Sequence, residues 1–279
     1  MGELVLHLLK YVVAALVLAM GLMAAPSDAT WLWRRPSLLL RSLLAMYVLV
    51  PGLAFLMVSG LALSPAVDAA LLVLAVSAGA PLLARKLRRV DSDAYALSLV
   101  ATTSLLAIVV VPAWVALLAR HFGVSSELPV PAVAWLVGKA FLLPFLAGMA
   151  IRAWVPDHAD RFAPRLFQVA GVALLVIALV LLVAQWRLLV ALPGAVLLAL
   201  VVFLVLALAI GHVLGGPDPA ERTVLGAACA TRHVGVAALV AAAYPGPAVT
   251  AIVAGYLIAS SLVSIPYLRW RQRTAPSAG

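Results

Sequence analysis

The segment Gly226–Ala238 reads GAACATRHVGVAA and places three adjacent polar residues, Thr231, Arg232 and His233, inside an otherwise small and apolar run. A charged side chain at such a position is costly in a membrane, so it should face protein or water and have a partner. Glycine on both sides loosens the helical backbone. We therefore expect the helix to part here into two half-helices.

A second apolar run is interrupted in the same way. Val76–Arg89 reads VSAGAPLLARKLRR, with Ser77, Gly79 and Pro81 in its interior. A pair of interrupted helices, one in each half of the chain, is typical of secondary transporters, whose binding sites form where the half-helices meet. Glycine and proline are also common in ordinary membrane helices, so the alternative is two kinked spans without a site.

The composition predicts an all-α polytopic membrane protein. Of 279 residues 66% are hydrophobic, the mean hydropathy is +1.18, and a soluble domain is about half apolar. Runs of about 20 apolar residues suit membrane helices, and they lack the alternation of a barrel. The single cysteine, Cys229, excludes an internal disulfide and a multi-cysteine metal site.

Nine spans are expected in one transmembrane domain, residues 1–273, followed by a short disordered tail, residues 274–279. The first 25 residues also resemble a signal peptide, but Lys10 interrupts the run and Glu3 spoils the basic start. The expected spans are Leu4–Ala25, Ser37–Gly60, Ala66–Ala84, Ala94–Leu118, Pro131–Trp154, Leu166–Trp186, Leu189–Leu214, Thr223–Tyr244 and Ala248–Leu268.

The basic residues orient these spans. Only Arg120 and Arg187 fall on one side, and the opposite side holds Arg34, Arg35, Arg41, Arg85, Lys86, Arg88, Arg89, Arg152, Arg161, Arg165, Arg222, Arg269, Arg271 and Arg273. The positive-inside rule then places the C-terminus in the cytoplasm and the N-terminus outside an inner membrane. The net charge of +9 thus reflects topology, and no nucleic-acid partner is expected.

Four segments carry a family resemblance together with the eighth span: AMGLMAAPSD from Ala19, RRPSLLLRSLLAMYVLVPGLAFLM from Arg34, ALSLVATTSLLAIVVVPAW from Ala96, and GKAFLLPFLAGMAIRAW from Gly138. Their order and spacing resemble the bile acid:sodium symporter family. That family has ten helices in two inverted repeats of five, with the fourth and ninth broken and crossed, and some members lack the first helix. The resemblance implies inverted repeats of four and five helices here, with the third and eighth spans broken and crossing.

The resemblance also implies sodium-coupled import of an organic anion, but most sodium ligands are replaced. Ser98 and Thr102 match the family's serine and threonine after the first crossing, whereas Met46, Ala228 and Arg232 stand where the family has glutamine, glutamate and glutamine. A hard cation prefers several oxygen ligands, usually including a carboxylate. Sodium is therefore doubtful, and no cofactor is expected.

Arg232 is central to the predicted site because it lies roughly 15 Å, or ten residues, from the inner end of its span. We expect its guanidinium to take the place of sodium, to contact half-helix carbonyls and Ser98 or Thr102, and to offer a fixed charge to an anionic substrate. The alternative is a structural clamp across the helix break. His233 is either a proton-coupling group or a satisfied interior histidine.

These features favour a secondary transporter that moves an organic anion by alternating access, either proton-coupled or uncoupled. A small panel of helices would move against a core containing the crossed pair. An enzyme is not expected, since no nucleophile with a base, metal cluster or phosphate loop is recognisable. The rival interpretation is a non-transporting membrane binding or sensor protein on the same fold. The expected partners are the small anion and membrane lipids.

Overall fold

The computed structural model describes residues 2–24, 27, 30–61, 63–78, 93–121, 135, 138–232, 237 and 248–274. In these ranges every regular element is helical, and no strand is found. The elements are α1 (Gly2–Met23), η1 (Leu32–Arg34), α3 (Pro36–Leu44), η2 (Ala45–Leu49), α4 (Val50–Gly60), α5 (Pro65–Val76), α7 (Asp93–His121), η3 (Gly138–Leu142), α9 (Leu143–Trp154), α10 (Pro156–Ala184), α11 (Trp186–Val190), α12 (Gly194–Leu214), α13 (Pro219–Ala230) and α15 (Ala248–Thr274).

The predicted polytopic character is confirmed at a coarse level. Four helical stretches of the described chain are long and apolar enough to cross a membrane, namely Pro36–Gly60, Pro156–Ala184, Gly194–Leu214 and Ala251–Thr274. Shorter apolar helices accompany them. Proline occupies the first turn of α3, α5, α10 and α13. An N–H at this position would have no acceptor within the helix, so its absence in proline costs no hydrogen bond.

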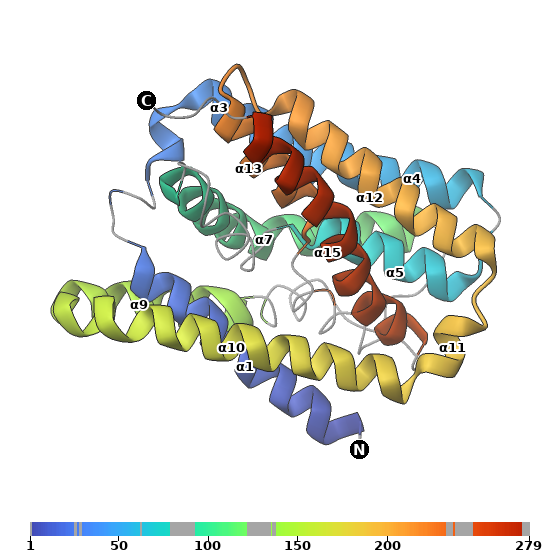
Figure 1. The fold of residues 1–279 in the computed structure, drawn as a ribbon, viewed down its shortest axis with the longest axis horizontal. Coiled ribbons are helices and arrows are strands. Elements are labelled where there is room, and N and C mark those ends of the chain that lie inside the picture. Colours follow the sequence, from blue (N-terminus) through green and yellow to red (C-terminus); the bar gives the residue numbers. More distant parts are fainter. Residues whose placement is uncertain are drawn as a thin grey trace.

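The helices form two groups, which we name the panel and the core (Figure 1). The panel consists of α1, α9 and α10, and α1 packs along both of the others. Glycine makes this approach close, because a Cβ at Gly21 would lie 2.2 Å from the carbonyl oxygen of Phe145, and one at Gly148 would lie 2.4 Å from that of Leu18. The interface therefore has no room for a methyl group at either position.

The core consists of α3, η2, α4, α5, α7, α12, α13 and α15. Helices α12 and α13 cross closely, because a Cβ at Gly211 would lie 2.4 Å from the carbonyl oxygen of Leu225. The turn between these two helices contains Gly216 with φ of 93°, a left-handed conformation that favours glycine. Panel and core meet where α10 contacts α15. Two short elements next to the panel helices also contact the core, since α11, which follows α10, contacts α15, and η3, which precedes α9, contacts α7.

Helix α10 begins ten residues before the predicted sixth span. Its first part lies on the panel, because Ala159 and Ala163 are buried against a cluster that includes Leu22. Arg152 fastens this end by donating to the carbonyl oxygen of Leu22 and to Asp160, each over 2.8 Å. Residues 156–165 thus continue the helix through an apolar stripe, although their other face is too polar for this stretch to be predicted as part of a span.

The two predicted interruptions coincide with observed helix ends. Helix α5 ends at Val76 and α13 ends at Ala230. Gly79, His233 and nearly all of the remainder of both predicted spans lie outside the described residues. The nine-span count, the crossing of the two broken helices and the inverted repeat therefore stay predictions.

Candidate functional site

Arg232 is held in the core directly beyond the end of α13. Among the side chains that the structure describes, it is the largest that is fully buried, with 1% of its surface exposed. Its Nη1 and Nη2 atoms both donate to the main-chain oxygen of Met46, each over 3.2 Å. The guanidinium therefore joins the end of α13 to the π-helical turn η2 of the second span.

The Met46 carbonyl accepts the guanidinium because its own helix offers it no donor. In an α-helix the N–H of Val50 would donate to Met46, but here it donates to Ala45, one residue earlier, as in a π-helix. The next candidate donor is Pro51, which has no N–H. A π-turn followed by proline thus leaves a main-chain oxygen free inside the bilayer, where an unsatisfied carbonyl is costly.

The neighbouring carbonyl is satisfied in a similar way. Tyr47 lies four residues before Pro51, so its regular helical donor is missing as well. The indole Nε1 of Trp114 donates to the Tyr47 oxygen over 2.9 Å. Two side chains from other core elements therefore complete the hydrogen bonding of the turn.

No carboxylate among the described residues neutralises Arg232. The ion pairs found there join Arg35 to Glu221 and Arg152 to Asp160. The C-terminus of α13 supplies partial negative charge next to Arg232, and one of its terminal oxygens, that of Ala230, accepts from the Tyr256 hydroxyl over 2.8 Å. The Nε of Arg232 is buried and has no hydrogen-bond acceptor in the described chain.

Ser98 and Thr102 are buried on α7, but the described contacts of Arg232 do not include them. The Ser98 hydroxyl accepts from the main-chain N–H of Leu32 over 2.8 Å, and the Thr102 hydroxyl accepts from the indole Nε1 of Trp33 over 3.1 Å. The expected contact of Ser98 or Thr102 with Arg232 therefore stays a prediction. These hydroxyls instead hold η1, which lies on the connection from the panel helix α1 to the core helix α3.

Ser77 and Thr231 lie at the two helix ends, as expected. The Ser77 hydroxyl donates to the carbonyl of Val73 over 2.6 Å, so it caps its own helix. The N–H of Thr231 donates to Ala227 over 2.8 Å, and Thr231 is 1% exposed. Gly79 and His233, the other two predicted site residues, lie outside the described residues.

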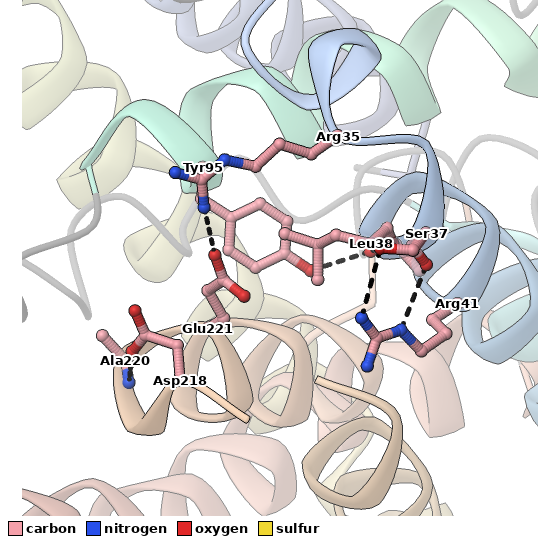
Figure 2. A network of polar contacts seen from close by, with 9 residues as sticks. Arg35, Ser37, Leu38, Arg41, Tyr95, Asp218, Ala220 and Glu221 are labelled. Carbon is pink, nitrogen blue, oxygen red and sulfur yellow. Dashed lines mark hydrogen bonds and ion pairs between the residues drawn. The ribbon is translucent and has the colours of Figure 1, made fainter. Parts of the chain in front are cut away.

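A polar network near the first turns of α3 and α13 was missed from the sequence (Figure 2). Arg35 donates to Glu221 over 2.6 Å and lies 4.1 Å above the Trp31 ring. Near it, Ser42 and the Tyr95 hydroxyl are 2.8 Å apart. These contacts tie the residue before α3 to the first turn of α13, and Ser42 near the end of α3 to α7.

Glu221 precedes the predicted eighth span and is 8% exposed. Burial raises the pKa of its carboxyl above the ordinary value, the Asp218 carboxylate acts in the same direction, and Arg35 and Arg41 oppose both. Two sequence signals could have indicated the site: an acid in the first turn of a helix, and an arginine directly before another helix. The pairing of Arg35 with Glu221, 186 residues apart, could not be predicted from the sequence.

The described residues offer no obvious metal site. No group of three histidine, cysteine, aspartate or glutamate side chains lies close enough there to hold an ion. At Met46, which stands where the family has a glutamine, the main-chain oxygen binds a guanidinium.

Fold and site define a multi-pass helical membrane protein with a buried cation directly beyond the end of a helix. The model of the Sodium Bile acid symporter family matches residues 11–192, and the chain belongs to this family. Its members are transporters and not enzymes, which implies a lipid environment and a small-molecule substrate. Arg232 lies beyond the matched range. A search of curated proteins gave no match.

Proposed function

We propose that the protein is a secondary carrier of a small organic anion that works by alternating access and has no sodium at the position of Arg232. The observation that carries the proposal is the buried guanidinium bound to a free main-chain carbonyl, without a carboxylate among the described residues. A covalently attached cation in this place makes a mobile sodium ion unnecessary.

The unbalanced charge favours an anionic substrate. A cation in the middle of a membrane costs at least about 2.5 kcal/mol on insertion scales. A bound anion would offset part of this cost in the low-dielectric interior. The site would therefore attract negatively charged solutes and repel free cations.

The arrangement of helices supports movement of the panel against the core. The panel packs on itself through Gly21 and Gly148, and its link to the core through η1 is fixed on α7. Rigid motion of one group of helices past another is the usual way in which such carriers alternate access. We also propose that the N-terminus lies outside an inner membrane. Transport is either coupled to protons through His233 or uncoupled.

Flux in proteoliposomes tests the function. Labelled monocarboxylates, dicarboxylates and a bile acid conjugate are offered in sodium or choline buffers, with and without a pH gradient. We expect anion flux that does not need sodium and that Arg232→Gln abolishes. The exposed Arg269 serves for the matched control Arg269→Gln, which should transport normally.

Two results would contradict the proposal. Strict dependence on sodium would show that a metal site exists elsewhere and drives transport. Absence of flux for every anion, in protein that is folded and inserted, would favour the rival function, a membrane binding or sensor protein on the same fold.

A further inference from the structure

Residues 31–35, which we name the strap, lie on the core directly before α3. The N–H of Leu32 donates to the hydroxyl of Ser98 over 2.8 Å. The indole of Trp33 donates to the hydroxyl of Thr102 over 3.1 Å. Ser98 and Thr102 are four positions apart, so they lie on the same face of α7. Consecutive strap residues therefore follow one face of this helix.

The first strap residue extends the alignment. The ring of Trp31 lies 5.7 Å from the ring of Tyr95, which precedes Ser98 by three positions and shares its face of α7. The side chains that the strap contacts are sealed, because Tyr95 and Ser98 are 0% exposed and Thr102 is 2% exposed. Trp33, in contrast, is 51% exposed. The strap thus lies at the surface and has buried hydroxyl groups beneath it.

The last strap residue fastens the strap to a second core helix. Arg35 donates to Glu221 in the first turn of α13 over 2.6 Å (Figure 2). Its guanidinium also lies 4.1 Å above the ring of Trp31, at the other end of the strap. Helices α7 and α13 contact each other, so the strap spans the seam between them.

The strap contacts are of the kind that can open and close. The Arg35 side chain is 52% exposed, and such an ion pair is weak because water competes for the charges. When the strap lifts, water can reach Glu221 and the hydroxyls of Ser98 and Thr102. Opening therefore leaves none of these polar groups buried without a partner. A closure held in this way can interchange with an open state of similar free energy.

We propose that the strap is a gate and that the ion pair of Arg35 with Glu221 latches it shut. Lifting the strap uncovers the seam between α7 and α13. Along α13 this seam leads towards Arg232, which is eleven residues or about 16 Å beyond Glu221. Arg35 and Glu221 are positioning residues, because they set how often the gate is open.

The gate rests on the proposed carrier function for its purpose. The strap belongs to the connection between α1 of the panel and α3 of the core, so movement of the panel would pull on it. In the proposed orientation the gate faces the cytoplasm. The latch itself can be tested without any solute.

Alkylation of a cysteine beneath the strap measures how often the gate opens. Ser98→Cys is made in a Cys229→Ala background, which removes the single natural cysteine, and the full-length protein in nanodiscs is treated with iodoacetamide. A sealed thiol reacts only after local opening, so the rate reports the open fraction. Ser264→Cys in the same background, at a position on α15 that is 0% exposed, gives the reference rate for a general loosening of the fold.

Arg35→Gln should raise the alkylation rate at position 98 roughly two- to fivefold, the range for a partly exposed ion pair, and leave the rate at position 264 unchanged. Arg35→Lys keeps the charge and should react nearly as slowly as the unchanged protein. Arg34→Gln is the matched control, because Arg34 is exposed and has no ion pair among the described residues. Adding Glu221→Gln to Arg35→Gln should raise the rate no further, since both changes break the same contact.

Three results would overturn the inference. The alkylation rate at position 98 could stay unchanged in Arg35→Gln, or rise equally in Arg34→Gln. A parallel rise at positions 98 and 264 would identify the ion pair as a support of the whole fold.

The outcomes also separate the gate from the proposed function. A latch that controls alkylation in a protein that moves no solute would leave the gate standing and remove transport. Anion flux that needs Arg232, in a protein whose alkylation at position 98 does not respond to Arg35→Gln, would leave the carrier standing and remove the latch.

Discussion

Replacing Arg232 with methionine separates the structural role of this side chain from its role in binding. Methionine keeps an unbranched apolar chain and loses the charge and every donor. Loss of the hydrogen bonds to Met46 costs about 1.5–3 kcal/mol, the usual range for a bond to a charged group. Removal of a cation from the membrane interior regains about 2.5–3.5 kcal/mol on insertion scales.

The two effects nearly cancel, so we expect the free energy of unfolding to change by less than about 2 kcal/mol. Since 1 kcal/mol corresponds to roughly 2–4 °C for large domains, the unfolding temperature of the purified protein should move by less than about 8 °C. Anion binding and transport should nevertheless be lost.

Two results would refute this reasoning. A variant that unfolds or loses far more stability than this would identify Arg232 as a clamp on which the helix break depends. A stable variant that still binds and moves anions would show that the buried charge has no part in recognition.

Three further predictions concern other parts of the fold. Trp33→Phe should lower the free energy of unfolding by about 1 kcal/mol through loss of the hydrogen bond to Thr102. In the Trp33→Phe background, Thr102→Val should lower the free energy of unfolding only slightly further. Full additivity of the two changes in a double-mutant cycle would contradict the hydrogen bond. Gly21→Ala should cost about 1–3 kcal/mol, because its Cβ would lie 2.2 Å from a carbonyl oxygen of α9. Gly52→Ala, with nothing within 4 Å, should be neutral or stabilising, and equal effects of both would contradict the close crossing. The raised pKa of Glu221 means that the folded chain holds this proton more tightly than the unfolded chain, so the free energy of unfolding should fall as the pH rises from 4.5 towards neutrality. In Glu221→Gln this fall in the free energy of unfolding should disappear. The same pH dependence in the variant and the unchanged protein would contradict the prediction.

The membrane class and the positions of the helix ends were predictable from the sequence because they depend on local composition. Long apolar runs specify membrane helices. Gly and Pro near Ser77, and Gly with polar residues near Thr231, mark places where a helix is weak. The ends of α5 and α13 fall at these places.

The partner of Arg232 was not predictable, because it depends on long-range geometry. Pro51 is a visible signal, since a proline inside a span frees an earlier carbonyl. The sequence does not show that the turn before it is π-helical, which decides that Met46 is the free acceptor. Nor does it show which of the basic residues reaches across 186 positions to it.

The roles of Ser98 and Thr102 were assigned from the resemblance alone. A family pattern indicates which hydroxyls lie near the site, but their partners depend on the loop before the second span. In this chain that loop presents an N–H of Leu32 and the indole of Trp33. Loop conformation is poorly encoded in local sequence, so these contacts with the loop could not be foreseen.

The most direct test of a built-in cation is the response of the purified protein to sodium in the absence of any substrate. Its unfolding temperature is measured in sodium, potassium and choline chloride at matched ionic strength. A ligand that binds only the folded state stabilises it in a saturable way, so a sodium carrier should show a rise specific to sodium. We predict the same unfolding temperature in all three salts, and a saturable rise specific to sodium would contradict the assignment of Arg232 to the place of the ion.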